Sequence, residues 1–596
     1  MFGIDISGLI EQYNNPQGYL MLGAFGVLVV MMIVLKDDRG TITTGRTVRT
    51  ADKLSANAKA LKQLRLPLDY QPPTLKNAKA KNKAQKSPSE RPQRPRDEVT
   101  LWAGKPPQFW WSGRWRKFGS RIQTLMGSPP ALWLPDAQRS VLVLGSPGSG
   151  KTASAIDPMI ESALAQGIPV LLYDKKGDQM RLHAPLAARY GYDVHVLAPG
   201  QPYSGIFNPV EFLKDSTDAV MAGELGAVIV RNAQSAQGGG RSDEFFSKAG
   251  EQLGKALIQL ARSTPYPDMG MVYALLQLPD FVYRIDQAVQ QGQIDPWVAA
   301  SFNQLLASKD AEKTVSSIMT TTAATFSSFI QKDLLPNFMG QSTIPARIEG
   351  KQMIIFKLDD ERRSIVGPLL AAAIHLCVVK NLATPRQDPI FIALDELPSI
   401  RLDRLPNWIN EYRSNGGAFA LGIQSLNQLY DTYGDKRGQA IASACATHLL
   451  FYPGDTQTAE SYSKRFGEKD FIHKQKSTGR TMAGRMSRNI NYSESLQKMP
   501  LFTPDEILRF RTGECVLASP GYGSGQETNV PYKLRVPMPK SEFKRIKQNM
   551  ALWDEYLCPY LTRQAAKVSE DQVYAALQER IAYANELLPP PPSEDE

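Results

Sequence analysis

Short apolar runs alternate with amphipathic helical stretches along much of the chain. Between Leu132 and Gly200 the segments RSVLVLGS, IPVLLYDKK and YDVHVLAPG are apolar runs, and ASAIDPMIESALAQG and RLHAPLAARYG between them have helical patterns. The runs are continuously apolar, as strands are when helices cover both faces of a parallel sheet. This order predicts an α/β fold with a central, mostly parallel sheet.

The strand pattern returns later in the chain, after a long helical interval. Further strands are predicted in QMIIFKLD, DPIFIALDE, GAFALGIQS, THLLFYPG and ECVLASPG. The interval from Phe212 to Pro345 contains amphipathic segments such as DEFFSKAGEQLGKALIQLA and few strand signals. We therefore expect an all-helical domain inserted into the sheet domain.

One stretch is apolar and long enough to cross a membrane. Residues 18–35 carry no charge and approach the length of a helix that spans about 30 Å of hydrocarbon. The preceding residues contain two acidic side chains, Asp5 and Glu11, and no basic ones, whereas positive charge follows from Lys36 onward. This is unlike a cleavable signal peptide. The positive-inside rule predicts a single-pass anchor with the N-terminus outside and the bulk in the cytoplasm; a buried core helix is the alternative.

The overall composition is that of an ordinary globular protein. The 596 residues are 42% hydrophobic and 21% charged, which excludes a wholly disordered, fibrous or polytopic membrane protein. The net charge of +10 comes from residues 36–117, where 20 Lys and Arg face 7 Asp and Glu. We interpret this segment as a basic linker, and its residues 36–100, which carry few large apolar side chains, as a mobile tether. Its positive charge attracts nucleic acid or anionic lipid, or is merely solvated. Four scattered cysteines and five histidines without ligand spacing indicate neither disulfides nor zinc.

Aromatic residues gather at the end of the basic segment, at Trp110, Trp111, Trp115 and Phe118. Three interpretations of this cluster remain open. The rings could stack on nucleobases, form a belt against the membrane surface, or be buried against the sheet domain.

The first predicted strand leads directly into GSPGSGKT, which fits the phosphate-loop pattern GxxxxGK[ST] and precedes a helix. Backbone N–H groups of such a loop wrap a phosphate, and the helix adds its positive end. The lysine can reach the β- and γ-phosphates, and the threonine hydroxyl can hold Mg²⁺. The predicted ATP-binding residues are Gly145, Ser146, Pro147, Gly148, Ser149, Gly150, Lys151 and Thr152.

A second acidic motif follows the buried strand in PIFIALDE. Asp395 leaves the sheet at its carboxyl end, where it can bind Mg²⁺ through water, and Glu396 can polarise the attacking water. A strand end that merely meets solvent is the alternative. With the phosphate loop upstream, the pair predicts an ATP- and Mg²⁺-dependent hydrolase.

Several motifs together resemble one family. In sequence and order they are similar to motifs of the type IV secretion coupling proteins, the membrane-anchored hexameric ATPases of bacterial conjugation. The motifs are GSPGSGKT, YDKKGD, LDELPSI, FALGIQSLNQLYDTYG and LFTPDEILRFRTGECVL. The resemblance covers Leu132 to Gly523. It implies a RecA-like P-loop NTPase with an inserted all-α domain and an inner-membrane anchor.

The resemblance also implies partners. These are DNA, most often a single strand bound to a relaxase, the relaxase itself with accessory proteins, further copies of the chain in a homohexamer, and the ATPases and inner-membrane subunits of the secretion channel. Family members typically have two membrane helices, whereas one is visible here. Contacts with the channel on the outer side of the membrane are therefore in doubt.

The resemblance assigns roles to three further residues. Gln424 in GIQS matches the γ-phosphate sensor, and Arg413 in EYRSNGG resembles an arginine finger that reaches the neighbouring subunit. A surface arginine is the alternative for Arg413. Lys176 in YDKKGD matches a family lysine, but its physical role stays open and a solvated turn lysine explains it equally well.

The expected organisation has seven parts: a short outer N-terminus (1–17), the membrane helix (18–35), the basic linker (36–117), the first part of the nucleotide-binding domain (118–211), the inserted helical domain (212–345), the second part of the nucleotide-binding domain (346–540), and a C-terminal helix with a Pro-rich acidic tail (541–596). The helix in the last part is expected from Ser569 to Leu588.

Three functions fit this reading. The first is an ATP-driven coupling protein that recruits a relaxase–DNA complex or effector proteins and drives them into a type IV secretion channel. The second is a docking receptor in which nucleotide controls assembly with little translocation. The third is a DNA motor of the FtsK or HerA type, which the single anchor and the LDELPSI and GIQS segments disfavour.

Overall fold

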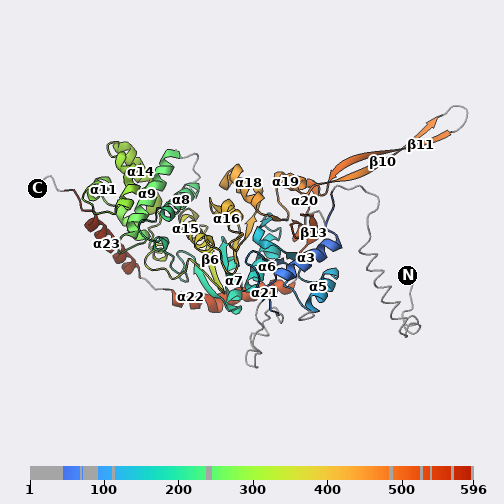
Figure 1. The fold of residues 1–596 in the computed structure, drawn as a ribbon, viewed down its shortest axis with the longest axis horizontal. Helices are drawn as coiled ribbons and strands as arrows, with labels where there is room; N and C mark the ends of the chain where they lie inside the picture. The colour runs from blue at the N-terminus through green and yellow to red at the C-terminus, as the bar shows by residue number, and fades with distance from the viewer. Residues whose placement is uncertain are drawn as a thin grey trace, which may run out of the picture.

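The computed structural model describes residues 45–67, 70, 92–109, 115–236, 244–481, 487–523, 528–536, 540–565 and 569–591 (Figure 1). The predicted outer N-terminus and membrane helix, residues 1–35, lie outside the described residues, as do Trp110 and Trp111 of the aromatic cluster and the last five residues of the acidic tail.

A large sheet forms the centre of the fold, with strand order β13-β12-β9-β3-β8-β7-β4-β6-β5. The strands from β9 to β5 run parallel, and β12 and β13 are antiparallel at one edge. All eight predicted strands are confirmed, whereas the edge strand β13 was not predicted. The strands are β3 (Val141–Leu144), β4 (Val170–Asp174), β5 (Asp193–Leu197), β6 (Gln352–Lys357), β7 (Ile390–Leu394), β8 (Gly417–Ile423), β9 (Thr447–Leu450), β12 (Glu514–Ala518) and β13 (Tyr532–Arg535).

Helices cover both faces of this sheet, which explains the continuously apolar strands. Along each central strand, alternate residues enter two different cores. One core contains α6 (Asp157–Gln166) and α7 (Asp178–Arg189). The other core contains helices from later in the chain: α15 (Arg363–Leu382), α16 (Leu405–Glu411), α17 (Leu426–Tyr433), α18 (Asp435–Ala444) and α19 (Thr456–Phe466).

The interval between β5 and β6 forms a helical lobe at one end of the molecule (Figure 1). Its described helices are α8 (Ala219–Ala236), α9 (Glu244–Arg262), α10 (Met269–Leu276), α11 (Phe281–Gln290), α12 (Pro296–Ala299), α13 (Asn303–Ala307) and α14 (Glu312–Ser327). Helices α8 and α9 approach closely at Gly226, where an added Cβ would lie 3.0 Å from the backbone of α9. Within the described residues, the regular elements of the interval are all helical, as its pattern predicts.

Helix α15 is apolar and long enough to cross a membrane, with a mean hydropathy of 1.8. Most of it is buried inside the protein, because it packs between the sheet and α8. It is therefore a core helix, and among the described residues no other helix meets the same criteria.

Part of the basic segment is folded, which differs from the mobile tether expected over residues 36–100. Residues 50–66 form α3 (Thr50–Gln63) and a short extension, and they bury Ala56, Ala60, Leu64 and Leu66. Further along lie β1 (Leu101–Ala103), α5 (Arg116–Leu125) and β2 (Leu132–Leu134), of which β1 and β2 pair. These elements were not predicted because the segment is highly charged. The apolar residues that α3 buries are small alanines, which give only a weak apolar pattern although they permit close packing.

A long antiparallel hairpin projects from the body (Figure 1). It consists of β10 (Glu468–Thr481) and β11 (Ser487–Pro500), with Glu468 opposite Pro500 and Thr481 opposite Ser487. It precedes the short helix α20 (Pro504–Ile507). The hairpin was not predicted, because its strands are polar and lack a regular alternation of apolar residues.

The C-terminal residues run along one side of the sheet domain and end on the helical lobe (Figure 1). Helix α21 (Lys540–Leu552) leads through a π turn to α22 (Cys558–Gln564) and then to α23 (Glu570–Leu587). The guanidinium of Arg545 in α21 donates two hydrogen bonds, of 2.5 and 2.6 Å, to Glu161 in α6. The predicted terminal helix is confirmed as α23, which begins with a capping box at Ser569.

A buried ion pair holds α23 against the lobe. Arg580 donates to both carboxylate oxygens of Asp268, at 2.5–3.1 Å, and both residues are buried. Asp268 also caps α10 by accepting the backbone N–H of Met271. The same two parts of the chain share an exposed pair, Lys332 with Glu570 at 2.8 Å.

We expect Arg580→Ala to release α23 from the lobe, because it leaves the Asp268 carboxylate buried without its cation, a change that costs about 3–5 kcal/mol. Hydrogen exchange in residues 570–587 should accelerate strongly. Lys332→Ala is the matched control, and since both partners of that pair are exposed, exchange should change little. Equal effects of the two substitutions would contradict the role given to the buried pair.

Candidate nucleotide site

A cavity of about 300 Å³ opens at the carboxyl ends of β3, β4 and β7. In parallel α/β sheets this is the edge where ligands bind. The cavity is lined by the phosphate loop, the turn after β4 and the acidic pair after β7, with residues Ser146, Pro147, Gly148, Gly150, Lys151, Thr152, Ala153, Asp174, Lys175, Lys176, Asp178, Gln179, Asp395 and Glu396.

The phosphate loop has a conformation that requires its glycines. Gly148 and Gly150 have φ of 78° and 93°, in the left-handed region that favours glycine. A Cβ on Gly145 would lie 2.5 Å from Ser149 Oγ and 2.8 Å from Cβ of Phe451. The loop is thus closed against the residue after β9, and Ser146 Oγ donates a 2.7 Å hydrogen bond to the Pro453 carbonyl.

A turn from a distant part of the chain donates hydrogen bonds to two carbonyl groups of the loop. The Gly513 N–H donates to the Ser149 carbonyl at 2.9 Å, and Thr512 Oγ1 donates to the Gly148 carbonyl at 3.3 Å. Carbonyl groups of the loop are satisfied here, which leaves the other side of the loop to face the cavity. This support could not be predicted, because no spacing rule connects residue 513 with residue 149.

Asp395 and Thr152 lie together in the cavity wall. Thr152 Oγ1 donates a 3.0 Å hydrogen bond to Asp395 Oδ2. Room for the carboxylate comes from Gly422 in β8, where an added Cβ would lie 2.2 Å from Asp395 Oδ1. Burial raises the pKa of Asp395 to about 6, with the charge of Lys151 opposing that shift. Burial therefore makes the ionised form of Asp395 less stable than it would be in water, and this carboxylate lies beside the Thr152 hydroxyl.

Glu396 joins three separate segments. Its Oε1 lies 3.5 Å from Lys151 Nζ, and its Oε2 accepts a 2.7 Å hydrogen bond from Gln424 Nε2. Its φ of 56° is unusual for a residue with a side chain, and such strain is concentrated at functional sites. The structure thus brings the predicted residues Lys151, Thr152, Asp395, Glu396 and Gln424 to one place.

The turn after β4 contributes two lysines that sequence reasoning left without a role. Asp174 is buried and accepts backbone N–H groups from Lys176, Gly177 and Met180, at 3.0, 2.9 and 2.7 Å. These bonds fix the turn so that Lys175 and Lys176 line the cavity. The available signal was the position of YDKKGD directly after a buried parallel strand.

Arg413 is not part of this cluster. It is exposed and precedes β8, whereas Gln424 follows the same strand. Since a strand rises about 3.3 Å per residue, the seven residues of β8 separate the two by roughly 20 Å. Arg413 therefore lies toward the opposite edge of the sheet from the cavity of its own chain.

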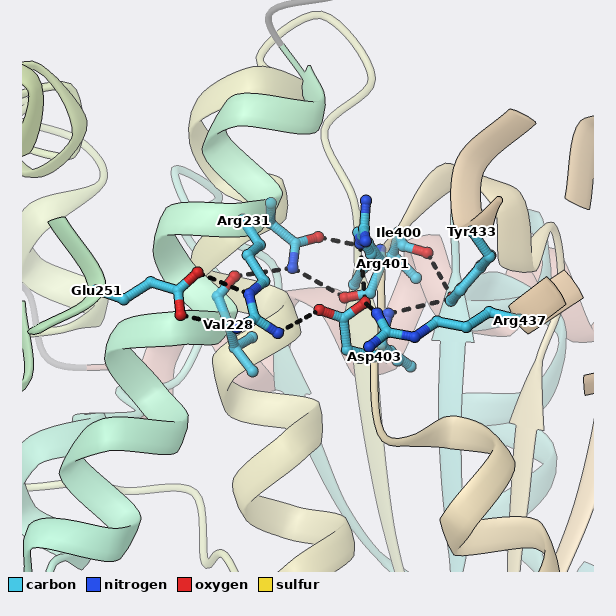
Figure 2. A network of polar contacts seen from close by, with 10 residues as sticks. Val228, Arg231, Glu251, Ile400, Arg401, Asp403, Tyr433 and Arg437 are labelled. Atoms are coloured by element: carbon cyan, nitrogen blue, oxygen red, sulfur yellow. Dashed lines mark hydrogen bonds and ion pairs between the residues drawn. The ribbon is translucent and has the colours of Figure 1, made fainter. Parts of the chain in front are cut away.

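A polar network connects the segment after Glu396 to the helical lobe (Figure 2). Asp403 accepts hydrogen bonds from Arg231 in α8 at 3.0 Å, from Arg401 at 2.8 Å and from Arg437 in α18 at 2.6 Å. Arg231 also pairs with Glu251 in α9 at 2.7 Å. Burial alone would raise the pKa of Asp403, but the arginines outweigh it and hold the pKa below its ordinary value.

The residues present fit a Mg²⁺–nucleotide complex. The ligands that Mg²⁺ prefers are oxygens, and in nucleotide sites one or two protein oxygens are joined by phosphates and water. Thr152 and Asp395 offer such oxygens side by side, beside a glycine-rich loop and three lysines. The described residues hold no group of three or more His, Cys, Asp or Glu that could bind a metal by itself.

Asp395 should make the nucleotide-free protein less stable as pH rises. Its folded pKa of about 6 exceeds the ordinary value of 3.8, so the native state binds more protons between those values and stability falls as pH rises through them. We expect the stability of Asp395→Asn relative to wild type to be greater at pH 7.5 than at pH 4.5 by about 1–2 kcal/mol. Denaturant unfolding at both pH values measures this, and a pH-independent difference would contradict it.

Solved structures resemble about two thirds of this chain. The plasmid coupling protein TrwB in complex with ADP and Mg²⁺ has a TM-score of 0.50 and 17% identity, over 68% of this chain and 86% of that one. TrwB in complex with the non-hydrolysable ATP analogue ADPNP gives the same score and identity, over 68% and 87%. At this identity the likeness shows the fold alone, which is RecA-like α/β.

Sequence comparison points the same way. The coupling protein TraD of Escherichia coli (strain K12) is 26% identical over 153 residues, which are 25% of this chain and 21% of TraD. The chain thus matches about a fifth of the length of that curated relative. Residues 130–523 match the family described as the type IV secretion-system coupling protein DNA-binding domain. Because this match takes in more than half of the chain, the chain belongs to the family of type IV secretion-system coupling proteins.

Proposed function

We propose that this chain is an ATP- and Mg²⁺-dependent hydrolase that couples nucleotide turnover to DNA transfer through a type IV secretion channel. The observation that carries the proposal is the contact of Glu396 with both Lys151 and Gln424. This contact joins the phosphate loop, the acidic motif and the end of β8 around one carboxylate. A protein that only binds nucleotide has no need of such a group beside the phosphates.

The side chains divide the work of phosphoryl transfer. The loop N–H groups and Lys151 would bind the phosphate oxygens of ATP. Thr152 and Asp395 would hold Mg²⁺, which when bound would supply positive charge against the phosphates. Glu396 orients the attacking water and accepts its proton. Gln424 is the γ-phosphate sensor, and its 2.7 Å hydrogen bond to Glu396 links that role to the catalytic carboxylate. Lys175 and Lys176 add positive charge at the cavity wall.

The proposal extends to location and assembly. Residues 18–35 anchor the chain in a bacterial inner membrane, with the N-terminus outside and the sheet domain and lobe in the cytoplasm. The chain forms a homohexamer, and its cargo is relaxase-bound DNA, with relaxase, accessory proteins and channel subunits as partners. The family match and the fold of the TrwB structures support this role.

The alternatives predict different behaviour. A nucleotide-gated docking receptor would hydrolyse ATP slowly and independently of DNA. A DNA motor of the FtsK or HerA type would be stimulated by DNA but would act without a secretion channel.

Hydrolysis by the full-length protein in detergent, measured with and without DNA, tests the proposal. We expect the rate to rise with added DNA, and parallel assays with single-stranded and duplex DNA identify the preferred form. ATP turnover that is low and indifferent to both forms would favour the receptor instead.

Two substitutions in the cavity should separate binding from chemistry. Lys151→Ala removes a charge-assisted contact with phosphate and should weaken ATP binding about 10–100-fold, with hydrolysis lost. Glu396→Gln keeps the shape of the side chain but cannot accept a proton, so ATP should still bind while turnover falls about 10²–10⁴-fold. Equilibrium nucleotide binding and single-turnover hydrolysis distinguish the two. Equal loss of affinity in both variants would remove Glu396 from the catalytic role.

Arg413 should act on the neighbouring subunit, because it lies toward the opposite edge of the sheet from its own cavity. We expect Arg413→Ala to bind ATP and assemble normally, yet to lose about 10³–10⁵-fold in hydrolysis rate. Mixed rings with Lys151→Ala subunits contain interfaces that join an intact loop to an intact arginine, so part of the activity should return. Mixed rings that stay inactive, or a fully active Arg413→Ala protein, would leave Arg413 a surface residue.

A further inference from the structure

Helix α5 buries its polar face and exposes its apolar face. The residues turned into the protein are Arg116, Gly119, Ser120 and Gln123. The exposed ones are Trp115, Phe118, Leu125 and Met126, at 60%, 52%, 46% and 67% exposure. A surface helix of a soluble protein normally shows the reverse pattern. Burial against the sheet domain, one of the three readings of the aromatic cluster, is therefore wrong for Trp115 and Phe118.

Specific contacts hold α5 in this orientation. Asn57 Nδ2 in α3 donates a 2.8 Å hydrogen bond to Ser120 Oγ. Gln123 Nε2 donates to the Gln108 carbonyl at 2.5 Å, and Arg116 donates to the Pro67 carbonyl at 3.1 Å. Burial lowers the pKa of Arg116 to about 10. Rotation of the helix would break these buried bonds, so the exposed apolar face is built into the fold.

The exposed side chains form one stripe with a basic margin. Trp115, Phe118 and Leu125 are exposed and Ile122 is half-buried, and their spacing by three and four residues places all four on one face of the helix. Lys117 and Arg121 are also exposed and lie four residues apart along one side of this stripe. The sequence between Glu98 and Asp136 contains no acidic residue. An apolar stripe edged with positive charge is typical of helices that lie in a membrane surface.

The position of α5 in the molecule fits that surface. The described chain begins at residue 45, ten residues after the predicted membrane helix ends at Leu35. Ten residues span at most about 35 Å, so residue 45 must stay close to the membrane if residues 18–35 cross it. Five residues after residue 45 the chain enters α3, which packs directly against α5. Both helices lie away from the helical lobe (Figure 1).

We propose that α5 lies in the interface of an anionic bilayer, with its apolar stripe among the acyl chains and Lys117 and Arg121 at lipid phosphates. The inference rests on the membrane anchor proposed above. Nucleobase stacking would use the rings of Trp115 and Phe118 but leaves Leu125 and Met126 exposed. Contact between two copies of this face would bring their basic margins together. The bilayer satisfies both the apolar stripe and its charge.

Spin labels on the full-length protein in lipid nanodiscs test this. In a Cys558→Ser background the remaining native cysteines, Cys377, Cys445 and Cys515, are buried. Labels are placed singly at Phe118→Cys and Leu125→Cys in α5, at Gly26→Cys in the predicted anchor, and at Tyr283→Cys in the lobe as a control. Accessibility to oxygen, which enriches in lipid, is compared with accessibility to a water-soluble nickel chelate.

In nanodiscs of phosphatidylcholine with phosphatidylglycerol, we expect the oxygen-to-nickel ratio to be several-fold higher at positions 118, 125 and 26 than at position 283. Lys117→Glu with Arg121→Glu should reduce the ratio at 118 and 125 without changing it at 26, because each basic residue near an anionic surface contributes about five-fold to binding. Lys544→Glu with Lys547→Glu, two exposed charges on α21, is the matched control and should change nothing. Pure phosphatidylcholine should weaken the α5 signal in the wild type alone.

The other possible outcomes overturn the proposal, and each does so in a distinguishable way. A label at 26 in lipid with labels at 118 and 125 in water overturns the role of α5 and leaves the anchor intact. Labels at 118 and 125 inaccessible to both reagents indicate a protein contact and also overturn it. Immobilisation of these labels by an oligonucleotide rather than by lipid would assign the stripe to base stacking. If position 26 is not in lipid, the anchor fails, and the inference fails with it.

Discussion

The contact of Glu396 with Lys151 and Gln424 sets the condition that the rest of the fold has to meet. These side chains follow three different strands, and they can meet only if the carboxyl ends of those strands are neighbours. The order β3-β8-β7 in the centre of the sheet provides this. Gly422 then leaves room for Asp395, since a side chain there would occupy the position of the carboxylate. The site therefore depends on sheet order as well as on motif residues.

Much of this arrangement could be predicted because its signals are local or follow from parallel topology. Each central strand is buried on both faces, so it appears in the sequence as a continuous apolar run. The loop GSPGSGKT shows its own glycines and lysine. Asp395 and Glu396 had to meet that loop because both motifs end parallel strands of one sheet. The predicted cluster of Lys151, Thr152, Asp395 and Glu396 follows from those two facts, whereas Gln424 was predicted only from the resemblance to the family.

The elements that escaped prediction have in common that they carry no apolar pattern from which their packing could be read. The support of Ser149 by Gly513 depends on a backbone hydrogen bond that leaves no pattern in the sequence. Helix α3 is too charged to look buried, and the polar hairpin of β10 and β11 lacks an apolar face. Helix α5 is more instructive: its aromatic residues were visible, but only the structure shows that they face outward.

The network around Asp403 gives the nucleotide site a physical route to the helical lobe. Asp403 lies seven residues after Glu396 in the chain, and a short 3₁₀ turn lies between them. Its carboxylate is bound by Arg231 of the lobe and by Arg437 of the sheet domain. Because a largely covered carboxylate is costly without its cations, the arginines bind Asp403 strongly, and this one side chain ties the segment after Glu396 to both the lobe and the sheet domain.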